Sequence, residues 1–199
     1  MAELPAAHEG LAQPYPAKPI RIVMPFSTGG TDLVTRWLAL KLAPAIGQQI
    51  LPEPRTGAGG NIGHELVAKA APDGYTLLMA APPFVVNPTL YGKVPYDPFR
   101  DFSPIMLCAA IPTLLVSHPS VPAKTLKELV DIARRSPNKL SYASGGIGST
   151  PHLSGELLKS LTKTQIVHVP YKGGALRLVG AMSGEVDIVF TTMSAAAAS

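Results

Sequence analysis

The chain has 199 residues, a formal net charge of +4 and an apolar content of 46%. This length allows one large domain or two small ones, with ample apolar material for a core. Lysine and arginine are scattered, and the densest cluster is only Arg134-Arg135. This disfavours a nucleic-acid binder, because such a protein concentrates its positive charge in a patch. No apolar run reaches the length of a transmembrane helix.

In the first half of the chain, strand-like and helix-like patterns alternate. The predicted strands are residues 19–25, 48–51 and 75–80. A helix with one apolar face follows the first strand to about Ile46, and Pro44 is expected to shorten it because proline disrupts a helix interior. Asn61 is expected to cap a second helix that runs through Ala70. This alternation favours a parallel α/β sheet.

The same pattern restarts after residue 102, where an irregular, turn-rich stretch ends. The predicted strands of this half are residues 105–110, 113–117, 140–143, 166–169 and 186–190. A capping box, Thr125 to Glu128, opens a helix that runs to Arg135. Pro151 is expected at the first position of another helix, where proline is well tolerated. The chain therefore predicts two similar α/β units in tandem.

Two glycine-rich turns carry the strongest functional signal. The first spans residues 25–32 and the second residues 144–152, and each follows a predicted strand and opens a helix. Glycine lets the backbone approach a ligand closely, and a helix start presents unpaired N–H groups with a partial positive charge. Two such turns facing each other across a cleft would bind a small anion from both sides. This pattern indicates a binding site built from backbone, without a catalytic group.

Three other chemistries are weakly supported. Gly57, Gly60 and Gly63 have the spacing of a dinucleotide-binding loop, but they follow the second strand instead of the first. None of the histidines pairs with another histidine or with cysteine at the spacing of metal ligands. A hydrolase could use Ser149 and His152, yet the motif G-x-S-x-G and an orienting carboxylate are missing.

Three individual side chains can be explained by structural roles alone. His152 lies at a helix start beside the second turn, where it either meets a ligand or serves the structure. His168 lies in an apolar strand and is expected to be a core or edge residue. Cys108, the only cysteine, falls in the apolar run 105–110, so a buried and inert thiol is expected.

Several motifs in chain order match one family. They are Tyr15-Pro16-x-Lys18-Pro19-Ile20-Arg21, Pro25-Phe26-x-x-Gly29-Gly30, Gly57-Ala58-Gly59-Gly60-Asn61-Ile62-Gly63, Ala71-Pro72-Asp73-Gly74-Tyr75, Asn87-Pro88, Leu90-Tyr91, His168-Val169-Pro170-Tyr171-Lys172-Gly173 and Gly184-x-Val186-Asp187. From Tyr15 to about Thr192, the chain resembles the Bug family, the periplasmic solute-binding subunits of tripartite tricarboxylate transporters. The resemblance implies an α/β fold of the periplasmic-binding-protein type, with two lobes that close on a ligand like a Venus flytrap.

The resemblance also implies a function. The chain would capture a small organic carboxylate in the periplasm for a tripartite tricarboxylate-type transporter, with membrane permease subunits as partners. No enzyme activity, metal, organic cofactor or nucleic acid is implied. The chain would not itself span the membrane, and a signal peptide absent from this sequence would direct its export. A carboxylate sensor that docks on a signalling receptor is the alternative, and a hydrolase is a lesser one.

The residues of the two turns supply most of the ligand-binding set that the resemblance implies. In the first lobe these residues are Phe26, Ser27, Thr28, Gly29 and Gly30. In the second lobe they are Ser144, Gly148, Ser149, Thr150, His152, Tyr171 and Thr192. Residues 1–14 are expected to be a stub left after signal removal, residues 15–102 the first lobe and residues 103–199 the second.

Three departures from the family pattern stand out. Only Thr31 separates Gly30 from Asp32, one residue fewer than in the family, so the first turn is expected to be reshaped. Residues 80–83 are Ala-Ala-Pro-Pro where the family has small hydroxyl residues. The chain stops at Ser199, whereas the family continues into a segment that returns to the first lobe. We therefore expect a C-terminally truncated chain with an incomplete first lobe.

Overall fold

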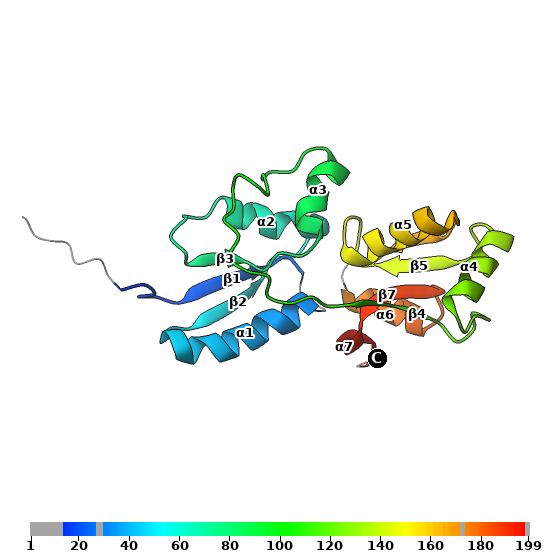
Figure 1. Ribbon diagram of the computed structural model, residues 1–199, viewed down its shortest axis with the longest axis horizontal. Coiled ribbons are helices and arrows are strands. Elements are labelled where there is room, and N and C mark those ends of the chain that lie inside the picture. Colours follow the sequence, from blue (N-terminus) through cyan, green and yellow to red (C-terminus); the bar gives the residue numbers. More distant parts are fainter. Residues whose placement is uncertain (1–13, 27–29, 172–173, 198–199) are drawn as a thin grey trace, which may run out of the picture.

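The computed structural model describes residues 14–26, 30–171 and 174–197, which form two α/β lobes side by side along the long axis of the molecule (Figure 1). Each lobe holds one sheet. The first sheet draws its strands from residues 20–78 and the second from residues 113–192. This arrangement agrees with two α/β units in tandem, and the lobe boundary near residue 102 stays a prediction.

The first lobe has a three-stranded, wholly parallel sheet of order β2-β1-β3. Its strands are β1 (Ile20–Met24), β2 (Ile50–Pro54) and β3 (Thr76–Leu78). The helices α1 (Gly30–Ile46) and α2 (Asn61–Ala68) cover opposite faces of this sheet (Figure 1). The central strand β1 is therefore covered on both sides, and its residues Val23 and Met24 are fully buried.

The expectation that Pro44 shortens the first helix is wrong. α1 contains Pro44 and continues to Ile46. Proline removes the N–H that would bond to the carbonyl four residues earlier, which belongs to Leu40. Leu40 is 75% exposed, so water can take the place of the missing donor and the helix need not end.

Sequence patterns do not predict α3 (Pro83–Tyr91), which begins at one proline and contains a second, Pro88. Pro83 is well tolerated at this position, because proline suits a helix start. Pro88 leaves the carbonyl of Phe84 without a helical donor. The hydroxyl of Tyr96 donates to that carbonyl at 3.0 Å and replaces the missing bond.

The second lobe has a four-stranded sheet of order β4-β7-β5-β6, in which β4 runs antiparallel to β7 and the other pairs are parallel. Its strands are β4 (Thr113–Ser117), β5 (Ser141–Ser144), β6 (Val167–Pro170) and β7 (Ile188–Thr192). Its helices are α4 (Leu126–Arg135), α5 (Thr150–Thr162), α6 (Gly174–Met182) and the short α7 (Met193–Ala196). The predicted capping box is confirmed at the start of α4, where the Glu128 N–H donates to Thr125 Oγ1 at 3.2 Å.

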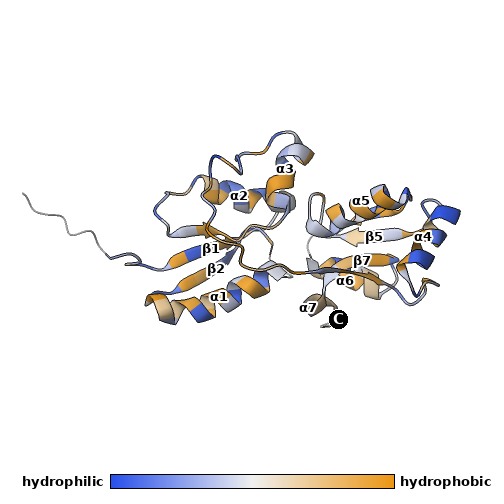
Figure 2. Ribbon diagram, in the orientation of Figure 1, coloured by the Kyte–Doolittle hydropathy of each residue, from blue (hydrophilic) through white to orange (hydrophobic). Residues whose placement is uncertain are grey.

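The core of the second lobe lies on both faces of its sheet. Leu129 and Ala133 of α4 belong to the same buried cluster as Tyr142 of β5. On the other face, Ala181 of α6 packs with Val189 of β7. The strand β7 is coloured hydrophobic in Figure 2 and is buried over most of its length, as expected for a central strand covered by helices on both faces.

The segment of residues 102–112 crosses from one lobe to the other as irregular chain (Figure 1). The prediction of a strand at residues 105–110 is therefore wrong. Leu107 in this segment is 84% exposed, and Cys108 is exposed instead of buried. The stretch is apolar (Figure 2), but it runs between the sheets, and no strand among the described residues pairs with it.

Candidate ligand-binding site

The second glycine turn is held together by bonds within itself. Ser144, the last residue of β5, is fully buried, and its Oγ accepts the N–H of Gly146 at 3.1 Å. Ser149 donates its hydroxyl to the Gly146 carbonyl at 2.7 Å and its N–H to the same carbonyl at 3.2 Å. Gly146 and Gly148 have φ values of +114° and +80°, which residues other than glycine rarely adopt. The residue types of this turn therefore favour one conformation.

Two histidines lie beneath this turn. His152, in the first turn of α5, accepts the N–H of Gly148 on its Nδ1 at 3.2 Å. His168 of β6 has its Nε2 2.6 Å from Ser144 Oγ, and its ring centroid is 4.4 Å from that of His152. Sequence reasoning placed His168 only in the core or at an edge, and it missed this contact because the partners lie on different elements.

The surroundings disfavour the charged form of both imidazoles. Burial lowers the pKa of His168 to about 4, and repulsion from His152 is a smaller cause. Burial also lowers the pKa of His152. Glu156 of α5 accepts hydrogen bonds from Lys159 Nζ and Tyr142 Oη, both at 2.8 Å. Burial works against its charge, but these bonds hold the pKa of the Glu156 carboxyl below its usual value.

The start of α5 offers two backbone donors. The N–H of Ser149 is bonded within the turn, and Pro151 has no N–H. By helix geometry, the N–H groups of Thr150 and His152 lack an intrahelical acceptor, and they lie at the positive end of the helix dipole. Residues 144–152 contain neither lysine nor arginine. Backbone groups are therefore the means by which this turn can attract an anion.

The first lobe meets the second turn through α3. Tyr91, at the end of α3, donates its hydroxyl to the carbonyl of Ile147 at 2.9 Å. A Cβ placed on Gly148 would lie 2.7 Å from Asn87 Oδ1, closer than packed atoms tolerate. The absence of a side chain at Gly148 therefore lets the two lobes approach each other here.

The glycine loop of residues 57–63, which sequence analysis weighed as a nucleotide motif, also faces the second turn. A Cβ on Gly59, in the short helix η1 (Ala58–Gly60), would lie 2.7 Å from the carbonyl oxygen of Ile147. The fully buried Asn87 donates from Nδ2 to the Gly59 carbonyl at 2.9 Å and to Asn61 Oδ1 at 2.7 Å. Asn87 thus ties α3 to this loop.

Asn87 and Tyr91 are absent from the set of site residues predicted from the sequence. Each lies in a short motif shared with the Bug family, Asn87-Pro88 and Leu90-Tyr91. The resemblance to the Bug family could therefore have indicated Asn87 and Tyr91 as candidate site residues. Their place opposite the second turn depends on how the lobes are packed, which motif spacing does not reveal.

The first glycine turn is described only at its two ends. Phe26 is half-buried, and its Cζ would lie 3.0 Å from a Cβ on Gly60. Gly30 opens α1 and packs against the side chain of Ile111 from the crossing segment. The predicted contacts at Ser27, Thr28 and Gly29 lie outside the described residues. That the two turns face each other across a ligand stays a prediction.

Tyr171 and Thr192 make contacts within the second lobe. Tyr171 donates its backbone N–H to the Ser144 carbonyl at 2.9 Å, and its ring packs against Gly180 of α6. Thr192 accepts the N–H of Ala195 on its hydroxyl at 3.4 Å and caps α7. Their proposed contact with a ligand stays a prediction.

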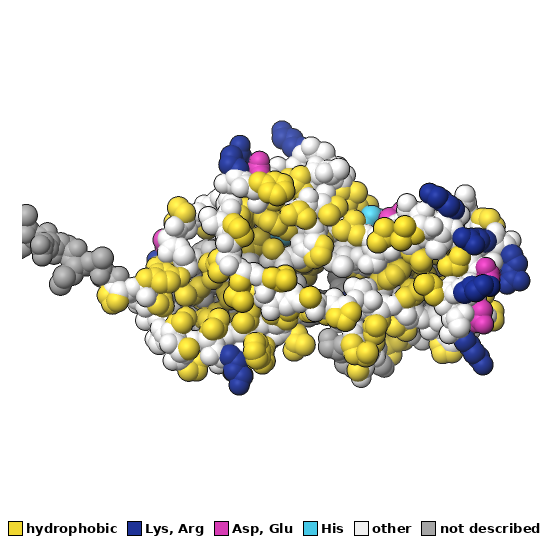
Figure 3. All heavy atoms as spheres, in the orientation of Figure 1, with side chains coloured by type: hydrophobic (Ala, Val, Ile, Leu, Met, Phe, Trp, Pro, Cys, Tyr) yellow, Lys and Arg dark blue, Asp and Glu magenta, His cyan; other side chains and the backbone are white. Residues whose placement is uncertain are grey.

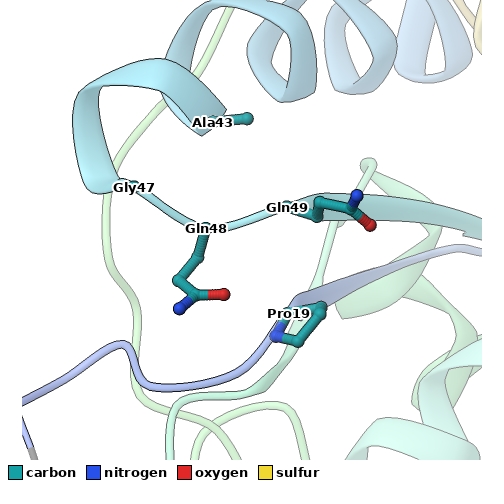
Figure 4. A pocket seen from close by; sticks show the side chains of 5 residues that line it. All are labelled: Pro19, Ala43, Gly47, Gln48 and Gln49. Carbon is teal, nitrogen blue, oxygen red and sulfur yellow. The ribbon is translucent and has the colours of Figure 1, made fainter.

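A surface pocket of about 540 Å³ lies away from both turns (Figure 4). It is lined by Pro19, Ala43, Gly47, Gln48 and Gln49. These residues lie around the C-terminal end of α1, opposite the glycine turn that precedes this helix. A helix C-terminus carries a partial negative charge, and neither lysine nor arginine lines the pocket, so it is a poor site for an anion.

Charged side chains gather away from the lobe junction. On the face shown in Figure 3, basic side chains cluster at the far end of the second lobe, while hydrophobic ones cover much of the first. Arg134 and Arg135 lie in the last turn of α4 at that far end. Within the described ranges, no group of three or more His, Cys, Asp or Glu side chains could hold a metal ion.

Residues 34–199 match the family model of the tripartite tricarboxylate transporter family receptor, TctC. The chain belongs to this receptor family. It is 35% identical to protein BugT of Bordetella pertussis over 197 residues, which cover 95% of this chain and 60% of BugT. The resemblance to the Bug family is thereby confirmed. This TctC-family chain spans 54% to 62% of the length of the first three curated relatives that it matches.

Two solved structures share the fold of this TctC-family chain. R. palustris Rpa4515 with adipate is 36% identical with a TM-score of 0.84, and the match covers 90% of this chain and 60% of that chain. MatC (Rpa3494) from Rhodopseudomonas palustris with bound malate is 32% identical with a TM-score of 0.79, covering 89% of this chain and 61% of that one. The two-lobed binding-protein fold is confirmed. Among the helices of the described residues, none is both long and apolar enough to cross a membrane.

Proposed function

We propose that this chain captures a small organic carboxylate where its two lobes meet, as the solute-binding receptor of a tripartite tricarboxylate-type transporter in the periplasm. One observation carries the proposal. The second glycine turn bonds internally, leaves the N–H groups of Thr150 and His152 at the start of α5, and is faced by α3 and η1 of the first lobe. Membership of the receptor family and relatives solved with adipate and malate support the ligand class.

The binding energy in this proposal comes from charge-assisted hydrogen bonds. A carboxylate oxygen is a strong acceptor, and bonds from N–H groups to an ionised oxygen are stronger than those between neutral groups. The positive end of the α5 dipole adds to them. Closure of the lobes over the ligand excludes water, which strengthens each of these bonds. Permease subunits of the transporter would then be the partners of the loaded receptor.

The hydrolase alternative has little support in the geometry. Ser149 donates its hydroxyl to the Gly146 carbonyl at 2.7 Å, and His152 uses Nδ1 to accept the Gly148 N–H. They are therefore not arranged as nucleophile and base. Ser144 is bonded to a histidine, but it is fully buried beneath the turn. A receptor fits these contacts and the family match better.

Calorimetric titration with adipate and with malate at pH 7.5 tests the proposal. We expect one-to-one binding of at least one of them, and weakening by about tenfold or more in the variant Thr150→Asp. Aspartate at the first position of α5 competes for the same N–H groups and repels an anionic ligand, while it favours the helix itself. The matched control is Ser160→Asp, which adds the same charge at an exposed position near the other end of α5.

Two results would overturn the proposal. If a panel of mono-, di- and tricarboxylates gives no binding to the folded protein, the ligand class is wrong. If a carboxylate binds equally well to the wild type and to Thr150→Asp, the site is wrong.

A further inference from the structure

Two backbone N–H groups of the second turn form hydrogen bonds that involve a histidine, one directly and one through a serine. The Gly148 N–H donates to His152 Nδ1 at 3.2 Å. The Gly146 N–H donates to Ser144 Oγ at 3.1 Å, and this oxygen lies 2.6 Å from His168 Nε2. The conformation of the turn is thus tied directly to one imidazole and through a serine hydroxyl to the other.

The first of these bonds fixes the protonation state of His152. An Nδ1 that accepts a hydrogen bond carries no proton, so His152 must be neutral with its proton on Nε2. A second proton would make Nδ1 a donor, and the Gly148 N–H would then face another donor. Charging His152 therefore breaks the bond that holds Gly148.

The two rings also limit each other's charge. Their centroids are 4.4 Å apart, and the ring of Tyr142 stacks on His168 with a centroid separation of 4.9 Å. Two imidazolium ions at this distance would repel strongly in a partly buried site. The pair therefore disfavours a state in which both imidazoles are charged.

The other groups around the pair offer little compensation. α5 contributes Glu156 and Lys159, and β5 contributes Tyr142. The Glu156 carboxylate is already bound by Lys159 Nζ and Tyr142 Oη, both at 2.8 Å. On the side of the first lobe, the neutral hydroxyl of Tyr91 contacts Ile147 of the turn. No unpaired carboxylate among these groups faces the imidazoles. Burial lowers the pKa of both His152 and His168 below the ordinary value of histidine.

We propose that His152, packed against His168, is a positioning residue that holds the second glycine turn in its binding conformation only while it is uncharged, so that acidification releases the bound carboxylate. This rests on the proposed function, since it names what sets the geometry of that same site. Neither imidazole needs to touch the ligand. The N–H groups at the start of α5 bind it, and His152 keeps the turn beside them in place.

The test compares the pH dependence of adipate binding in matched variants. In His152→Asn, the amide oxygen can replace Nδ1 as the acceptor for Gly148, but the side chain does not titrate. The affinity of this variant for adipate at pH 7.5 is the reference for its own pH profile. Between pH 7 and pH 5, the wild type should lose at least threefold more affinity than the variant. Adipate's own carboxyl groups titrate equally in both experiments, so their effect cancels in the ratio.

Two controls separate this effect from general acid damage. His118→Asn removes a histidine from the same lobe, outside the turn, and should keep the wild-type profile. Circular dichroism at each pH shows whether the protein is still folded. If His152→Asn fails to fold, the protonation state of His152 in the wild type, measured by NMR, decides the proposal.

NMR of the ligand-free protein gives an independent readout. With ¹⁵N-labelled histidine, we expect Nδ1 of His152 to be unprotonated at pH 7 and the amide signal of Gly148 to shift as His152 titrates. The proposal is overturned if His152 carries its proton on Nδ1, or if the wild type and His152→Asn lose adipate affinity in parallel. Failure of the wild type to bind any carboxylate at pH 7.5 would instead overturn the proposed function and leave the NMR result to decide the role of His152 in the turn.

Discussion

Gly148 lies where the two lobes touch, so the substitution Gly148→Ala tests the lobe contact directly. The added Cβ would lie 2.7 Å from Asn87 Oδ1. Asn87 cannot retreat freely, because it is fully buried and its Nδ2 is bonded to Gly59 and Asn61. Forcing an extra methyl group into a packed contact typically costs about 1–3 kcal/mol. We therefore expect adipate to bind about 5- to 150-fold more weakly, since each 1.4 kcal/mol is about a factor of ten.

The matched control is Gly146→Ala in the same turn. Gly146 and Gly148 both have positive φ, +114° and +80°, so alanine at either position strains the backbone by about 1–3 kcal/mol. A Cβ on Gly146 would meet nothing closer than the Tyr171 carbonyl oxygen at 4.0 Å. Backbone strain is thus common to both variants, and the clash with the first lobe is specific to Gly148.

Urea unfolding and calorimetry separate the two effects. Both variants should lower the free energy of unfolding of the second lobe by a similar amount. Only Gly148→Ala should lose the additional affinity for adipate. Equal losses of affinity in the two variants would refute the reasoning, because they would show that the contact with Asn87 contributes nothing to binding.

Two further predictions concern a hydroxyl and a buried imidazole. Tyr91→Phe removes the 2.9 Å bond to the Ile147 carbonyl, which is worth about 0.5–1.5 kcal/mol. Calorimetry should therefore show that adipate binds about 2- to 12-fold more weakly. The control Tyr15→Phe removes a bond to Gly74 within the first lobe and should leave the affinity unchanged. Burial lowers the pKa of the fully buried His64 from 6.5 to about 4, so the unfolded state binds more protons and stability falls as the pH drops from about 6.5 towards 4. Urea unfolding should show a loss on the order of 2 kcal/mol in the first lobe between pH 7 and pH 5, and equal stability at both values would contradict this assignment.

Local signals predicted those elements whose causes are local. The capping box at Thr125 and Glu128 marked the start of α4 because both of its bonds join residues three positions apart. α3 escaped prediction because the donor that compensates for Pro88 is the hydroxyl of Tyr96, which lies outside the helix. The apolar run at 105–110 looked like a strand, and its lack of a partner is visible only once both sheets are placed.

The candidate site divides in the same way. The second turn could be anticipated, because glycines and a helix start lie next to each other in the chain. The residues facing it could not, since Tyr91 bonds to Ile147 across 56 positions of sequence. The pairing of His152 with His168 likewise joins α5 to β6, and no spacing rule connects those two elements.

Within the described residues, neither sheet borrows a strand from the other lobe. The described strands of each sheet come from one uninterrupted stretch of chain, and the first stretch leaves the ribosome before the second. The contacts of Tyr91 and Asn87 with the second turn can form only after both stretches have folded. Such contacts can open and close without breaking a single strand pair, so the junction can exchange its contents while the hydrogen bonds of both sheets stay protected from solvent.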